Sequence, residues 1–76
     1  MNGVFMEKLL VLIGENVRKY RIERGLLPDE LAEMAGLSLD EVRMLEQGKG
    51  NIEMIVISKV SKALDVSISH LVSIKN

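Results

Sequence analysis

Few side chains in this sequence are of the types that carry out covalent or metal chemistry. Its 76 residues include one histidine, His70, and no cysteine. The lack of cysteine excludes disulfide scaffolds, thiol catalysis and zinc fingers, and neither glycine-rich phosphate-binding pattern occurs in the chain. A lone histidine with scattered carboxylates is a poor metal site and is more typical of a surface or half-buried helical residue. We therefore expect no enzyme, no metal, no cofactor and no small-molecule ligand.

The composition is that of one small folded domain. Hydrophobic residues make up 47% of the chain and charged residues 28%, with a formal net charge of −1, so we expect a single domain over residues 1–76. The longest apolar run, residues 9–13, is far shorter than the roughly twenty residues of a membrane span. The N-terminus also lacks the features of a secretory signal. These observations predict a cytoplasmic protein that does not enter a membrane.

Helical periodicity, with little strand-like alternation, runs through most of the chain. Pro28 suits the first turn of a helix because its missing N–H would be unpaired there, and Ser38 with Glu41 forms a capping-box pattern. The predicted helices span residues 7–24, 28–35, 39–46, 53–64 and 68–72. Five helices joined by short loops predict a compact all-α domain, preceded by a short N-terminal extension at residues 1–6.

The connection between the second and third predicted helices has the features of a helix-turn-helix. Such a motif needs a small residue where two helices cross, a glycine that can adopt positive φ, and apolar residues that hold the pair together. Ala32 and Gly36 occupy the first two positions. The apolar positions are filled by Leu31, Leu37, Val42 and Leu45. These residue types at the correct mutual spacing predict a helix-turn-helix at about residues 28–46.

Residues 13–71 resemble the Cro/CI-type (XRE-like) helix-turn-helix family of phage and bacterial transcriptional regulators. The matching stretches are I-G-E-N-V-R-K-Y-R-I-E-R-G-L, D-E-L-A-E-M-A-G-L-S, V-R-M-L-E-Q-G-K and K-V-S-K-A-L-D-V-S. Within that family the chain is most similar to the small dimeric controller regulators of restriction–modification systems, in the stretch G-N-I-E-M-I-V-I-S-K-V. The resemblance implies a five-helix, lambda-repressor-like DNA-binding domain whose partner is double-stranded DNA.

The resemblance also implies which residues face the DNA. In the family the third helix enters the major groove, while the start of the second helix and the loop after the third contact phosphates. Carried over by position, the DNA-facing residues are Ser38, Leu39, Asp40, Arg43, Met44, Gln47 and Lys49. Lys49 matches a loop lysine that contacts the DNA backbone. Leu27 and Pro28 replace the Ser or Thr and the Gln that often open the second helix, so a usual phosphate contact is missing.

The family pattern further implies an internal ion pair between Arg21 and Glu46. Each of these residues lies on the apolar side of its predicted helix, and a buried charge needs a partner. A bidentate arginine–carboxylate pair satisfies both groups. We expect this pair to be structural and to orient the turn after the third helix.

The distribution of charge conflicts with DNA binding at the helix-turn-helix itself. Residues 1–24 hold five basic and three acidic residues, residues 47–76 hold four and two, and residues 25–46 hold one and six. Phosphate neutralisation by lysine and arginine supplies much of the affinity for DNA, although acidic residues in first helical turns are also common helix stabilisers. The charges leave an alternative open. A protein-interaction module of the same fold could pair with or antagonise another regulator and bind DNA weakly or not at all.

The fourth predicted helix has more apolar residues than one inward stripe needs. Met54, Ile57 and Val60 fill that stripe, so Ile55 and Val56 occupy positions that are usually polar in the family. These two residues form either a wider buried stripe beneath the N-terminal segment or a homodimer contact, and we favour the dimer. Two-fold symmetry would place paired third helices at half-sites about one DNA turn apart. The sequence as a whole predicts a transcriptional regulator that binds operator DNA as a homodimer.

Overall fold

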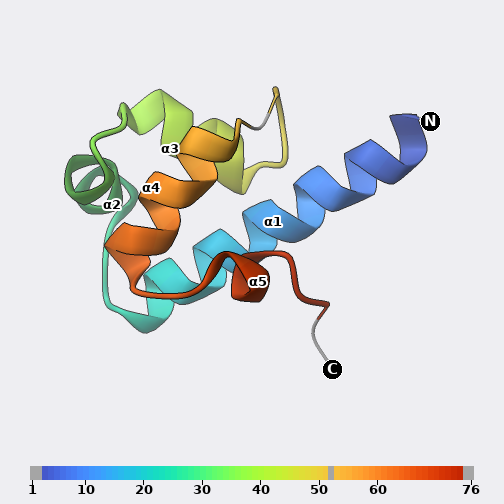
Figure 1. Cartoon of the computed structure of the whole chain (residues 1–76). Coiled ribbons are helices and arrows are strands. Elements are labelled where there is room, and N and C mark those ends of the chain that lie inside the picture. The colour runs from blue at the N-terminus through green and yellow to red at the C-terminus, as the bar shows by residue number, and fades with distance from the viewer. Residues whose placement is uncertain (1–2, 52, 75–76) are drawn as a thin grey trace.

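The computed structural model of the chain describes residues 3–51 and 53–74, which form five α-helices and no strand. The helices are α1 (Gly3–Glu23), α2 (Pro28–Ala35), α3 (Leu39–Glu46), α4 (Met54–Leu64) and α5 (Ile68–Leu71). In Figure 1, α2 and α3 lie toward the left of the view, and α1 runs across it from the N-terminus at the upper right to the lower left. The all-α, five-helix fold predicted from the sequence is confirmed.

Local sequence signals explain where α2 and α3 begin and end. Pro28 is the first residue of α2, where its missing N–H costs no hydrogen bond. The helix ends at Gly36, whose φ of 71° is a left-handed conformation that glycine adopts without a steric penalty. At the start of α3 the Ser38 hydroxyl accepts a hydrogen bond from the Glu41 N–H (3.0 Å), so the predicted capping box is present.

The first helix differs from its prediction at the N-terminal end. It begins at Gly3, whereas the sequence predicts a start near Glu7 and a separate extension over residues 1–6. Residues 3–6 contain no proline or other helix-ending signal, so the helix continues through them; residues 1 and 2 lie outside the described part. None of residues 3–12 is buried, and the first buried residue of α1 is Ile13. We call residues 3–12 the arm, which stands out from the body of the domain (Figure 1).

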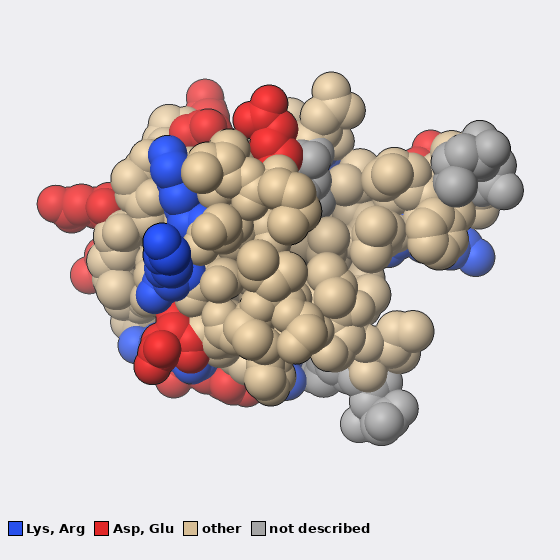
Figure 2. All heavy atoms as spheres, viewed as in Figure 1, with Lys and Arg blue, Asp and Glu red and all other residues tan. Residues whose placement is uncertain are grey.

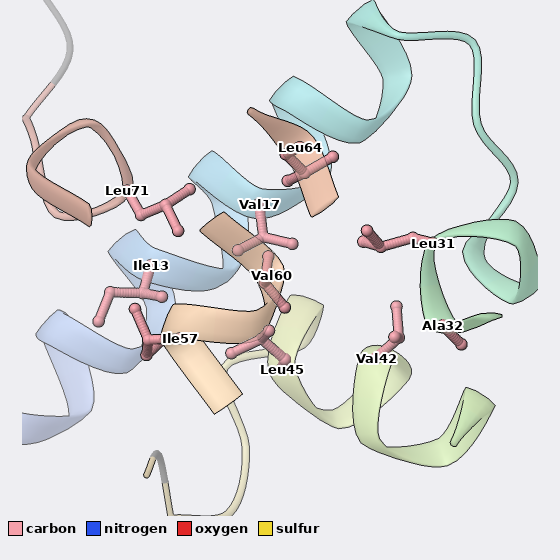
Figure 3. Close-up of a cluster of buried hydrophobic side chains, with 10 residues drawn as sticks. All are labelled: Ile13, Val17, Leu31, Ala32, Val42, Leu45, Ile57, Val60, Leu64 and Leu71. Atoms are coloured by element: carbon pink, nitrogen blue, oxygen red, sulfur yellow. The ribbon is translucent and has the colours of Figure 1, made fainter. Parts of the chain in front are cut away.

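All five helices contribute to one buried core (Figure 3). The core cluster consists of Ile13, Val17, Leu31, Ala32, Val42, Leu45, Ile57, Val60, Leu64 and Leu71. The residues predicted to hold α2 against α3 belong to this cluster, apart from Leu37, which is half-buried and packs against it. The inner sides of α2 and α3 are therefore fixed against the rest of the domain.

One predicted core position in α4 is wrong. The sequence places Met54 in the inward stripe of the helix, but its side chain is 67% exposed. Ile57, Val60 and Leu64 are buried as predicted. Met54 is the first residue of α4, and the first buried residue of the helix is Ile57. The beginning of α4 therefore lies outside the core.

The C-terminal segment is tied to α1 by Asn16, a residue that no sequence pattern singles out. Asn16 is only 2% exposed, and its Nδ2 donates hydrogen bonds to the carbonyl oxygens of Leu71 (2.8 Å) and Ser73 (2.9 Å). Both hydrogens of the side-chain amide are thereby used. Since the Leu71 side chain is fully buried, polar and apolar contacts together fix α5 to α1.

The helices α1 and α3 approach each other closely at Gly14. A Cβ atom at this position would lie 2.4 Å from the carbonyl oxygen of Leu45 and 2.8 Å from that of Glu46. Gly14 lies in the middle of α1, so it is required for space and not for a turn. Gly25 and Gly36, in contrast, follow the ends of α1 and α2 with positive φ, which the sequence predicts for Gly36.

Candidate nucleic-acid interface

The helices α2 and α3 form a packed pair with one free side. Leu31 of α2 and Val42 of α3 are fully buried, and Ala32 is 4% exposed at the place where the helices cross. The connection between them contains Gly36 and the half-buried Leu37. Because the inner sides of both helices are held in the core, the opposite side of α3 faces solvent. This arrangement is a helix-turn-helix.

Most of the residues predicted to read DNA lie on the solvent side of α3. Asp40 and Arg43 are exposed, Met44 is 44% exposed and Leu39 is half-buried. No hydrogen bond or ion pair joins the side chain of Asp40 or Arg43 to another described residue. These two polar groups are therefore available to an external partner.

The other three predicted DNA contacts flank α3. Ser38 precedes the helix, and its hydroxyl is used as the helix cap. Gln47 is the residue after the helix and is exposed. Lys49 is exposed in the loop that follows. The structure thus brings a polar side chain and a cation to the C-terminal end of α3, while Ser38 serves the fold.

A shallow hollow of about 320 Å³ joins the start of α2 to the exposed side of α3. Its lining consists of Leu27, Pro28, Asp29, Leu39 and Arg43. The hollow shows that the beginning of α2 and the outer side of α3 belong to one continuous surface. On that surface the side chain of Leu27 is 61% exposed, in the position where the family often has a polar residue.

Arg21 and Glu46 form a buried ion pair beneath this surface. Arg21 Nε lies 2.6 Å from Glu46 Oε2, and Arg21 Nη2 lies 3.1 Å from Glu46 Oε1. Each side chain is 10% exposed. The remaining guanidinium nitrogen, Nη1, donates to the carbonyl oxygen of Leu26 (2.8 Å). One arginine of α1 therefore holds both the last residue of α3 and the loop that enters α2.

The packed pair lies inside a segment that matches a known family. The helix-turn-helix family model matches residues 17–71, which is most of the chain. The chain belongs to the helix-turn-helix family. Membership agrees with the Cro/CI-type (XRE-like) resemblance of the sequence, and the matched range contains all of α2, α3 and α4.

Three known proteins show what the chain is similar to. It is 35% identical over 66 residues to the HTH-type transcriptional regulator SinR of Bacillus licheniformis, covering 86% of the chain and 60% of SinR. It is 31% identical over 62 residues to the control protein C.SmaI of Serratia marcescens, covering 82% and 74%. The structure matches the restriction-modification controller protein C.AhdI of Aeromonas hydrophila with a TM-score of 0.78 and 34% identity, covering 82% and 94%. The chain thus spans about 60% of the length of SinR.

The acidic residues of this helix-turn-helix are not equally free. Glu30 and Glu41 each accept a hydrogen bond, 2.8 Å long in both cases, from a backbone N–H at the start of their own helix. Glu46 is neutralised by Arg21. The remaining acidic side chains are Asp29, Glu33 and Asp40, all of them exposed. Half of the six acidic residues in 25–46 therefore serve the fold, which reduces the conflict with a negatively charged partner.

The two residues of α4 predicted as a dimer contact differ in exposure. Ile55 is 59% exposed, whereas Val56 is half-buried and packs against the core. Val56 thus matches the wider buried stripe that is the alternative interpretation. In Figure 2 the charged spheres lie mainly over the left part of the molecule and along its top and lower left edges, while the surface over the middle is mostly uncharged. Ile55 remains a candidate for contact with a second copy.

The lone histidine lies away from the solvent side of α3. His70 is exposed in α5, with its Nδ1 2.5 Å from the Ser67 hydroxyl and its ring edge-on to Tyr20 at a centroid distance of 6.3 Å. Within residues 3–51 and 53–74, no group of three or more His, Asp or Glu side chains is arranged to hold a metal ion. The same residues contain no helix long and apolar enough to cross a membrane.

Proposed function

We propose that the chain is a transcriptional regulator that binds operator DNA as a homodimer through its helix-turn-helix. The observation that carries this proposal is the solvent side of α3, where the Arg43 and Asp40 side chains project from a firmly packed helix pair and have no partner among the described residues. The names of SinR, a transcriptional regulator, and C.SmaI, a control protein, support the same role. Binding an operator requires the chain to work beside the chromosome, which in a bacterium is the cytoplasm.

In this proposal α3 enters the major groove. Arg43 donates two hydrogen bonds to a guanine, which is the commonest base-specific contact, and Asp40 accepts one from a cytosine. Leu39 and Met44 pack against thymine methyl groups, while Lys49 neutralises a phosphate. Few direct contacts are available on so short a helix, so the sequence-dependent shape of the DNA contributes to specificity.

Selection from a random duplex pool at low salt tests the proposal. We expect enrichment of a two-fold symmetric site whose halves are about one helical turn apart. Affinity for that site should fall with salt on a log–log plot, with a slope of about −0.9 per phosphate neutralised. A pool that shows no enrichment at low salt would overturn DNA binding.

Two substitutions then assign the contacts. Arg43→Ala should cost about 1–3 kcal/mol of binding free energy and relax specificity at one position of each half-site. Lys49→Ala should weaken binding to all sequences alike and make the salt slope shallower by about one unit. Lys49→Arg keeps the charge and is the matched control. Equal effects of Lys49→Ala and Lys49→Arg would remove the phosphate role from Lys49.

A protein partner on the same surface is the second candidate function. The observation that favours it is the hollow between α2 and α3, because its rim includes the exposed apolar side chain of Leu27. Leu27→Ser separates the two functions. The substitution should weaken a protein complex formed at the hollow, whereas DNA binding should not weaken, because the family often has Ser or Thr at this position.

A further inference from the structure

The arm of α1 is mostly apolar, and much of its outer side is exposed, although Gly48 lies against Val11 at the inner end. Seven of residues 3–12 are apolar, and only Glu7 and Lys8 are charged. Leu9 packs against the core on the inner side, but Val4 is 58% exposed and Val11 46% exposed. A helix that is hydrophobic all round is normally buried inside a larger structure. The exposed valines of the arm therefore offer apolar surface to a partner.

Four residues of the arm share one outer face. Val4, Glu7, Lys8 and Val11 are spaced by three, one and three residues, which places them on neighbouring turns of the same side of the helix. All four are exposed. No ion pair joins Glu7 or Lys8 to another residue of the described ranges. The face thus presents two apolar groups with one charge of each sign between them.

We propose that the arms of two copies pair antiparallel through this face, across a two-fold axis that passes beside Glu7 and Lys8. In this register Val4 of one protomer meets Val11 of its partner, and Glu7 meets Lys8 of its partner. Two-fold symmetry makes each of these contacts twice. The pairing goes beyond the proposed function, because it uses a self-association surface that includes neither Ile55 nor any residue of α3.

A second copy fits this face better than other occupants do. The pattern is complementary to itself, since apolar groups meet apolar groups and unlike charges meet at the centre. A membrane-surface helix needs a polar face rich in lysine and arginine, whereas the arm has one lysine and one glutamate. In Figure 1 the arm and α2 lie at opposite ends of the molecule, so pairing through the arm leaves the start of α2 uncovered.

Sedimentation of the full chain tests the pairing. Each protomer buries two valines in the contact, so Val4→Lys/Val11→Lys should raise the dissociation constant of the dimer by at least about tenfold. The matched control is Ile22→Lys, on the same side of α1 outside the arm, where the side chain is 55% exposed. Ile22→Lys should leave self-association unchanged. Circular dichroism checks that each variant retains its helix content.

Two further variant sets test the register. Glu7→Lys and Lys8→Glu should each weaken the dimer about threefold or more, and the combined Glu7→Lys/Lys8→Glu should restore it. The chain has no cysteine, so single cysteines can report proximity. A mixture of Val4→Cys and Val11→Cys should form a mixed cross-linked dimer with a short bis-maleimide. Either variant alone should cross-link poorly, because antiparallel pairing separates like positions by about 10 Å along the helix.

The outcomes separate this pairing from the proposed function. A monomeric wild-type chain, or a dimer that survives Val4→Lys/Val11→Lys, overturns the arm pairing. If Ile55→Lys alone abolishes the dimer, the homodimer of the proposed function stands and the arm pairing fails. The two proposals can also fail separately. If the arm variants are monomeric and the wild-type dimer enriches no DNA site, the arm pairing is supported and DNA binding is rejected. If the wild-type chain bound lipid vesicles through the arm and did not self-associate, the arm pairing would also be overturned.

Discussion

All three guanidinium nitrogen atoms of Arg21 are engaged, two by Glu46 and one by the Leu26 carbonyl. Glu46→Ala would leave a largely buried cation with one carbonyl partner. We expect the free energy of unfolding to fall by about 3–5 kcal/mol, as for other buried pairs broken on one side. Urea denaturation followed by circular dichroism measures the loss.

Two controls separate the lost charge pair from a general effect of substitution. Glu46→Gln keeps an acceptor for Arg21 and should cost less than Glu46→Ala. Glu33→Ala removes an exposed carboxylate from α2 and should change stability by no more than about 0.5 kcal/mol. If Glu46→Ala cost no more than Glu33→Ala, the pair would have no structural role.

Among the elements, the contact of α1 with the C-terminal end of α3 depends on the absence of a side chain at Gly14. Gly14→Ala should destabilise the domain by about 1–3 kcal/mol, because backbone atoms of α3 stand where the Cβ would lie. This loss should outweigh the gain of about 1 kcal/mol that alanine brings to a helix interior. Gly3→Ala in the same helix meets no atom within 4 Å, so it should cause no loss. Thermal unfolding of both variants checks the difference, and equal behaviour would contradict it.

The elements were predictable from the sequence wherever a local signal marks a boundary. Pro28, Gly36 and Ser38 define the ends of α2 and α3, and the observed bounds match the predicted ones. The start of α1 had no such signal, so residues 3–6 were assigned to an extension although they are helical. Asn16 and Gly14 were not found, because their roles depend on which helices meet and not on periodicity along one helix.

For the whole molecule, the arrangement of charge matters more than the net charge of −1. Glu30 caps α2 through the Leu27 N–H, whereas the exposed side chain of Glu33 on the same helix makes no hydrogen bond or ion pair with another described residue. Glu33→Gln should therefore strengthen DNA binding about two- to fivefold at low salt, with the gain fading as salt screens the charge. Fluorescence anisotropy at several salt concentrations measures this gain.

Glu30→Gln is the comparison for that experiment. It removes the same charge, but it also weakens the acceptor at the start of α2, so it should lower thermal stability while Glu33→Gln leaves it unchanged. If neither substitution altered DNA affinity, charge repulsion at α2 would not limit binding.

The site was only partly predictable from the sequence. The resemblance assigned the positions of Arg43, Asp40 and Lys49, and the structure finds all three exposed. It could not distinguish Ile55 from Val56, since both are apolar and adjacent, and their exposure depends on how α4 sits against the core. A surface used by a second copy is still harder to infer, because residue type alone does not show whether an apolar side chain faces its own core or a neighbour.

The tie between Asn16 and the segment at Leu71 and Ser73 also affects how the chain folds during synthesis. Leu71 and Ser73 follow Asn16 by 55 and 57 positions. The ribosome synthesises the chain from its N-terminal end, so they emerge much later than Asn16. Residues 28–46 therefore emerge well before Leu71 can fill its place in the core and before the Asn16 amide finds its acceptors. Until then the core lacks the Leu71 side chain. A chain that has emerged only as far as α4 would hold a helix-turn-helix whose core still lacks Leu71.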